Sequence, residues 1–93
     1  MNEPLAPEAA KWVIREILRA GRLTYSSHAK QELLADELTT LDVVNVLRGG
    51  VVRPGEFEHG SWRYRVETQR LAVVIAFRSA LHLVVVTAWR RRP

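Results

Sequence analysis

Cysteine is absent from this chain of 93 residues, and its absence excludes several kinds of chemistry. The protein can form no disulfide, has no thiolate nucleophile and cannot hold a metal through sulfur. Such a composition suits a reducing compartment, so the sequence predicts a cytoplasmic protein.

Long hydrophobic runs are also missing. The longest apolar stretches, residues 71–77 and 81–89, are far shorter than the roughly 20 residues of a membrane-spanning helix. The first residues, MNEPLAPEAAK, have no basic start followed by an apolar run, so we expect no signal peptide. Because 47% of the residues are apolar and lie in short segments, we expect one domain over residues 1–93, folded around a single core.

The common cofactor and metal motifs do not occur. The chain has no glycine-rich phosphate loop, no nucleophile elbow and no dinucleotide-binding fingerprint. Its three histidines, His28, His59 and His82, are scattered, and its acidic residues lack metal-ligand spacing. We therefore expect neither a metal nor a cofactor, and any chemistry must come from His, Arg, Tyr, Thr and Glu side chains.

Acidic residues are scarce in the last third of the chain. Residues 61–93 contain seven arginines and one acidic residue, Glu67, whereas residues 1–60 contain seven basic and nine acidic residues. Twelve of the fourteen basic residues are arginine, whose planar guanidinium suits phosphate recognition. This clustering favours an anionic partner such as RNA, although an arginine-rich genome gives the same count.

Helical spacing of apolar residues dominates the first half of the chain. Pro7 suits the first turn of a helix and Gly21 its end, while Ser26 or Ser27 offers an N-cap for the next helix. The predicted helices cover about 7–20, 27–36 and 40–48.

Strand-like alternation begins near residue 50. Trp62, Tyr64 and Val66 alternate with charged residues, which gives one apolar and one charged face. The predicted strands cover about 51–57, 61–67, 71–77 and 81–89, with turn residues between them. The expected fold class is α+β, with the helices packed on one face of a four-stranded antiparallel β-meander.

Arg63 and Arg65 are candidate phosphate ligands on the charged face. Residues two apart on a strand point the same way, about 7 Å from each other, which matches neighbouring phosphodiester oxygens. Charged residues are also usual on a solvent-facing strand, so a purely structural role stays open. Thr87 and Arg90, near the end of the last strand, are placed to line a cleft.

His28 has two interpretations. In the first turn of a helix, the positive end of the helix dipole disfavours the imidazolium form, which keeps the ring a neutral base. An exposed polar residue at a helix start also needs no function. Whether His28 reaches the face that carries Arg63 and Arg65 decides between the two.

Four segments together resemble domain-of-unknown-function family 4258. They are Ser27-His28-Ala29, the stretch from Leu41 to Val52, Trp62-Arg63-Tyr64-Arg65-Val66, and Val84-Val85-Val86-Thr87-Ala88-Trp89. The resemblance covers about residues 23–90, and it rests on the order and spacing of short pieces. It places the chain near the small α+β toxins of the RelE, BrnT and MqsR group, which are largely metal-independent ribonucleases, and so implies a RelE-like architecture.

By position, the family's histidine is His28 and its second-strand tyrosine is Tyr64. Its terminal "T-V-Y" is Thr87-Ala88-Trp89, so Trp89 replaces the usual tyrosine. Where the family often has arginine after "H-A-x-x", this chain has Glu32, the fifth residue counted from His28, and Lys30 is the third. Because position 89 is tryptophan, a tyrosine cannot act as the acid there.

These observations predict a toxin-like, metal-independent endoribonuclease from a bacterial toxin–antitoxin pair. The expected catalytic residues are His28, Arg63, Arg65 and Tyr64, with Thr87, Arg90, Arg78 and Lys30 as RNA ligands. The expected partners are mRNA, free or bound to the ribosome, and a cognate antitoxin. Two alternatives stay open: a non-catalytic RNA- or ribosome-binding module, and an interaction domain that binds an acidic protein.

Overall fold

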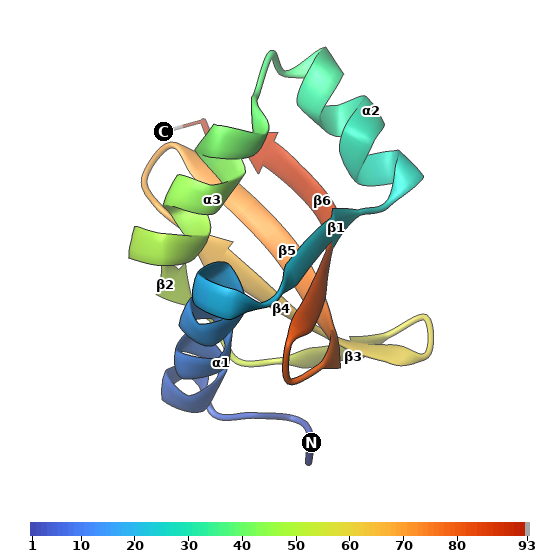
Figure 1. Ribbon diagram of the computed structural model, residues 1–93. Coiled ribbons are helices and arrows are strands. Elements are labelled where there is room, and N and C mark those ends of the chain that lie inside the picture. Colours follow the sequence, from blue (N-terminus) through green and yellow to red (C-terminus); the bar gives the residue numbers. More distant parts are fainter. Residues whose placement is uncertain (93) are drawn as a thin grey trace.

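The computed structural model describes residues 1–92 and contains three helices and six strands (Figure 1). The helices are α1 (Pro7–Ala20), α2 (Ser27–Ala35) and α3 (Thr40–Gly49). The strands are β1 (Arg22–Tyr25), β2 (Val51–Val52), β3 (Glu56–Glu58), β4 (Ser61–Glu67), β5 (Leu71–Ser79) and β6 (His82–Arg90). The predicted α+β class is therefore confirmed, and the helix limits agree with the prediction to within a residue.

The sheet is mixed rather than a four-stranded antiparallel meander. Its order is β1-β6-β5-β4-β2, and β3 pairs with β4 beyond the end of β2. Residues 22–25, which lie outside the predicted strands, form β1, which runs parallel to β6. The strand predicted over 51–57 is split, because Pro54 and Gly55 separate β2 from β3.

Gly21 joins α1 directly to β1. Its amide donates to the carbonyl of Ile17 at 2.8 Å, and the next amide, that of Arg22, donates to the carbonyl of Leu81 at 2.8 Å. A Cβ atom at Gly21 would overlap that Leu81 carbonyl, so only glycine permits this close approach. The chain therefore enters the sheet at the edge of β6 immediately after α1.

Side-chain caps begin α2 and α3. Ser26 Oγ accepts a hydrogen bond from the Ala29 amide at 3.0 Å, and it also donates to the carbonyl of Val86 at 2.8 Å. Thr39 and Asp42 form a reciprocal capping box at the start of α3. The Ser26 contacts fix the start of α2 beside the second half of β6.

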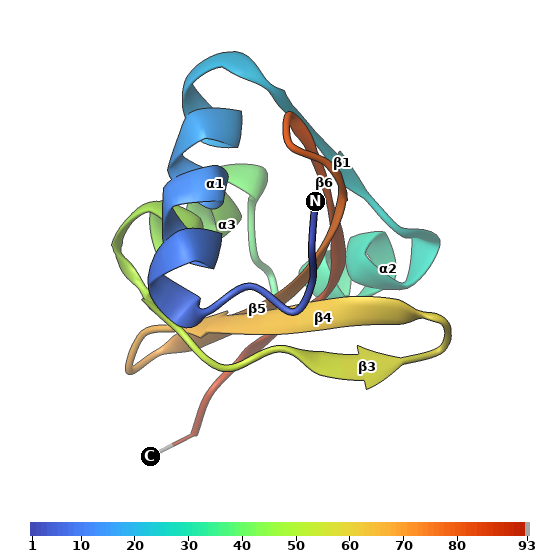
Figure 2. The ribbon, with the colours of Figure 1, turned by 90° about the horizontal axis from the view of Figure 1, so that it is seen from below.

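One face of the sheet carries the core, and the helices pack against this face (Figure 2). Ile14 of α1, Leu33 of α2 and Leu47 of α3 pack in one cluster with Ile75 and other sheet residues. Burying a side chain of this size contributes about 1.5–3 kcal/mol. Within residues 1–92, no helix covers the opposite face of the sheet, and none is long and apolar enough to cross a membrane.

A tight hairpin joins β3 to β4. His59 and Gly60 form its turn, and both residues have positive φ, 49° and 80°. Two such residues are typical of a two-residue hairpin turn whose twist matches the strands. The turn sets the register in which Glu56 lies opposite Arg63.

Candidate functional site

A charged cleft of about 250 Å³ lies on the uncovered face of the sheet. Its lining residues come from β3, β4, β5, β6 and the segment after β2. They are Arg53, Pro54, Glu56, Glu58, Arg63, Arg65, Val74, Thr87 and Trp89. We call this hollow the arginine cleft.

Strand register explains why these residues meet. Arg65 pairs with Val74, which pairs with Thr87, so the three lie in one row across β4, β5 and β6. In the next row, Ala72 lies between Glu67 and Trp89. With strands about 4.8 Å apart, the β4 and β6 side chains stand about 10 Å apart. Val74 and Ala72 of β5 lie between them, and because these side chains are small, they form the bottom of the cleft.

A buried carboxylate holds two of the cleft arginines. Glu67 is only 6% exposed. Its Oε1 accepts a hydrogen bond from Arg53 Nε at 2.8 Å, and its Oε2 forms an ion pair with Arg65, whose Nε lies 3.1 Å away. Arg91 Nη1 lies 3.8 Å from the same carboxylate. The hydrogen bond from Arg53 holds the pKa of Glu67 below its usual value, and the charges of the arginines reinforce this against the effect of burial. Glu67 thus stays ionised and fixes both side chains through Nε, which leaves their terminal Nη groups for another acceptor.

Arg63 differs from its two neighbours. Its Nε is 3.5 Å from Ser61 Oγ, and among the described residues it forms no ion pair with a carboxylate. Glu56 and Glu58 lie beside it on β3, are exposed and line the same cleft. The cleft therefore combines guanidinium groups, which can bind a phosphate, with two accessible carboxylates, which can accept a proton.

Positive charge continues from the cleft toward the C-terminal end of β6. Arg91 Nη1 donates to the carbonyl of Thr68 at 2.7 Å, so Arg91 bridges Glu67 and the β4–β5 turn. A neighbouring hollow is lined by Gln69, Arg70, Arg91 and Arg92. An extended anion therefore has further arginines beside the cleft.

Three of the predicted site residues, Arg63, Arg65 and Thr87, come together in the arginine cleft. His28 does not line it. It lies in the first turn of α2, with its side chain 63% exposed and its Nε2 3.8 Å from Glu32 Oε1. His59 lies in the hairpin turn, and His82 hydrogen bonds Thr24 at 2.9 Å, so no histidine lines the cleft.

Tyr64 faces the core, which places it away from the cleft. It is fully buried, and its hydroxyl donates to Glu3 Oε2 and accepts from the Leu5 amide, both at 2.9 Å. Burial raises the pKa of Tyr64 to about 12. The expected catalytic role conflicts with this position, because the hydroxyl already anchors the N-terminal segment.

The other predicted RNA ligands lie apart from one another. Arg90 hydrogen bonds to Asp36 at the end of α2. Its Nε donates to the Asp36 carbonyl at 2.9 Å, and its amide donates to Asp36 Oδ2 at 3.0 Å. Lys30 is exposed on α2, and Arg78 is exposed at the end of β5. None of the three lines the arginine cleft.

Sequence reasoning missed Arg53, Glu56 and Glu58. They lie in the stretch 51–57 and just after it, which was predicted as one strand, and no motif marks them. The pairing of Val52 with Val66 and of Glu56 with Arg63 brings them to the cleft. The one available signal was the Pro54-Gly55 break, which separates the two short strands.

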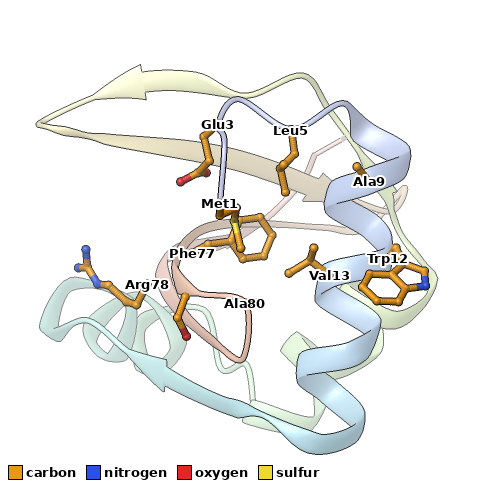
Figure 3. A pocket seen from close by; sticks show the side chains of 10 residues that line it. Met1, Glu3, Leu5, Ala9, Trp12, Val13, Phe77, Arg78 and Ala80 are labelled. Carbon is orange, nitrogen blue, oxygen red and sulfur yellow. The ribbon is translucent and has the colours of Figure 1, made fainter.

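A larger, apolar hollow of about 820 Å³ lies between α1, the N-terminal segment and the β5–β6 turn. Figure 3 shows Met1, Val13 and Phe77 gathered between these elements, with Trp12 beside them. Glu3 provides the one carboxylate among its lining residues, and this carboxylate already accepts a hydrogen bond from the Tyr64 hydroxyl. This apolar groove offers space for an apolar group but no pair of groups for acid–base chemistry.

The residues that the structure describes contain no group of three or more His, Cys, Asp or Glu side chains able to hold a metal. Comparison with protein-family models, curated proteins and solved structures finds no match to this chain. The resemblance to domain-of-unknown-function family 4258 therefore stays a prediction, and the functional argument rests on the cleft.

Proposed function

We propose that the protein binds RNA in the arginine cleft and cleaves it without a metal, as the toxin of a bacterial toxin–antitoxin pair with a RelE-like architecture. The observation that carries the proposal is the grouping of Arg53, Arg63 and Arg65 beside two exposed carboxylates. Guanidinium groups that converge on one hollow suit a phosphodiester, and two of these three are already oriented by Glu67.

The proposed reaction uses the 2′-hydroxyl of RNA as the nucleophile. Glu56 or Glu58 takes its proton as the new bond to phosphorus forms, and the arginines stabilise the negative charge of the phosphorane. The bond to the 5′-oxygen then breaks, and that oxygen takes a proton from water at the open cleft. The products are a 2′,3′-cyclic phosphate and a 5′-hydroxyl. The proton acceptor is thus a β3 carboxylate in place of His28, which lies on α2.

The test is to incubate the purified protein with total RNA in the presence of EDTA and to map new ends. Cleavage to 2′,3′-cyclic phosphate ends is expected for the parent, for His28→Ala and for Arg15→Gln. Arg15 is an exposed α1 arginine outside the cleft, so it controls for the loss of one positive charge. We expect Arg63→Gln and the double variant Glu56→Gln/Glu58→Gln to lose most of the cleavage.

Binding is measured in the same series. Arg63→Gln is expected to weaken RNA binding at low salt and to reduce the slope of log K against log salt by about 0.7, the value for one phosphate contact on a single strand. Arg15→Gln is expected to change neither. If His28→Ala lost cleavage while Glu56→Gln/Glu58→Gln stayed active, the result would contradict the β3 carboxylate as the proton acceptor.

A non-catalytic RNA-binding module is the second candidate, and the absence of any histidine from the cleft favours it. It predicts salt-dependent RNA affinity that needs Arg63, with RNA left intact. A protein that neither binds nor cleaves RNA would contradict both candidates and favour a protein-interaction domain.

A further inference from the structure

Trp89 forms one wall of the arginine cleft, opposite the arginines. It is partly buried and shares the cleft with Thr87 and Val74. Ala72 lies between Trp89 and Glu67 in the strand register, so no large side chain separates the indole from the arginine side. The indole therefore lines the same cleft as the guanidinium groups, across the small side chains of β5.

Four of the seven aromatic residues pack against another aromatic ring, and Trp89 is not one of these four. Trp62 packs edge-on against Phe57 at 5.4 Å, and Tyr64 packs against Phe77 at 5.3 Å. Neither of these aromatic pairs, the two found in residues 1–92, includes Trp89. An indole without an aromatic partner, in a cleft whose other lining residues are mostly charged, is available to a planar ligand.

We propose that Trp89 is a stacking platform for an unpaired nucleobase, so that the arginine cleft selects single-stranded RNA. This inference rests on the proposed RNA function and names its substrate class. Arg65 lies in the row next to that of Trp89, and the β4 and β6 rows are about 10 Å apart, so one nucleotide can place its phosphate against Arg65 and its base against Trp89. A base inside a duplex has both faces covered by its neighbours, so it cannot stack on the indole.

The test uses a variant in which Trp89 is the only tryptophan. Trp12→Phe/Trp62→Phe provides it, because Trp12 is exposed and phenylalanine at 62 keeps a ring against Phe57. The probes are a short unstructured 2′-O-methyl RNA, which cannot be cleaved by 2′-hydroxyl attack, an abasic strand with the same phosphates, and a blunt duplex. We expect the unstructured strand to quench Trp89 fluorescence and the other two to leave it unchanged.

Binding of the three probes to Trp89→Leu and Trp89→Phe completes the test. We expect Trp89→Leu to bind the unstructured strand about 10- to 100-fold more weakly, down to the affinity of the abasic strand. Trp89→Phe should retain most of the affinity, and melting curves of both variants verify their folding. Equal affinity of the parent for abasic and intact strands, or unchanged Trp89 fluorescence with bound RNA, would overturn the stacking role alone. Failure of all probes to bind the parent would overturn the RNA function as well.

Discussion

The arginine cleft and the apolar groove are two hollows of this small protein that different forces organise. In the cleft, the buried carboxylate of Glu67 orients charged side chains from β2–β3 and β4. In the groove, the buried hydroxyl of Tyr64 ties down an N-terminal segment whose apolar side chains line the hollow. One buried polar group on β4 supports each hollow, and the odd spacing of three residues between Tyr64 and Glu67 sends these groups to opposite faces. The larger hollow is therefore not the better chemical site.

The largest effect is expected from Glu67→Gln. The amide cannot balance Arg53 and Arg65, so like charges are left close together in a partly buried place. We expect the melting temperature to fall by several degrees and RNA affinity to decrease, because the arginines lose their fixed orientation. Glu16→Gln, which removes a carboxylate from a surface pair with Arg19, is the matched control and should change little. Equal melting temperatures for the two variants would contradict the role of Glu67.

The stability of the fold at acid pH should also depend on the Glu67 carboxylate. Because the folded-state pKa of Glu67 lies below the ordinary value of 4.5, its ionised form stabilises the fold at neutral pH. That contribution is present above about pH 4.5 and is lost as pH falls through the lowered value. Denaturation measured from pH 7 to pH 2 should therefore show a shallower acid loss in Glu67→Gln than in the parent. Parallel profiles would argue against the ion-paired Glu67.

A smaller effect is expected from Tyr64→Phe. The change removes one hydroxyl and leaves the Leu5 amide and the Glu3 carboxylate without this partner. The free energy of unfolding should fall by about 1 kcal/mol in urea titrations. RNA binding and cleavage should be unchanged, since the hydroxyl lies on the covered side of the sheet. Lost cleavage in a folded Tyr64→Phe protein would restore the catalytic role predicted from the resemblance.

The smallest effect is expected from Trp12→Ser in the apolar groove. Trp12 is 65% exposed, so its loss should change the free energy of unfolding by no more than about 0.5 kcal/mol. Binding of a hydrophobic dye should decrease, while RNA affinity stays the same. Weaker RNA binding in this variant would show that the two hollows are not independent.

Much of the fold could be predicted because the relevant signals are local. Pro7 and Gly21 mark α1, and the alternation from Trp62 to Glu67 matches β4. β1 could not be predicted in this way, because four residues at a sheet edge carry no periodic pattern of their own. Their extended form depends on hydrogen bonds to β6, more than fifty residues away.

Only part of the candidate site could be predicted from the sequence. Arg63 and Arg65 are recognisable because both project from one face of a strand, which is a local property. Arg53, Glu56 and Trp89 reach the same cleft only because of the way the strands pair, and strand pairing is not a local property of the sequence.

The sequence by itself determined the α+β class, the helix limits, the apolar and charged faces of β4 and the lack of sulfur chemistry. These properties follow from local periodicity, capping and composition, which need no knowledge of distant contacts. The tertiary structure decided that β1 joins β6, that His28 lies away from the arginines, and that Glu67 holds two of them. Those outcomes depend on strand order and on the side of the sheet that the helices cover, because hydrogen bonds and packing between distant segments fix both.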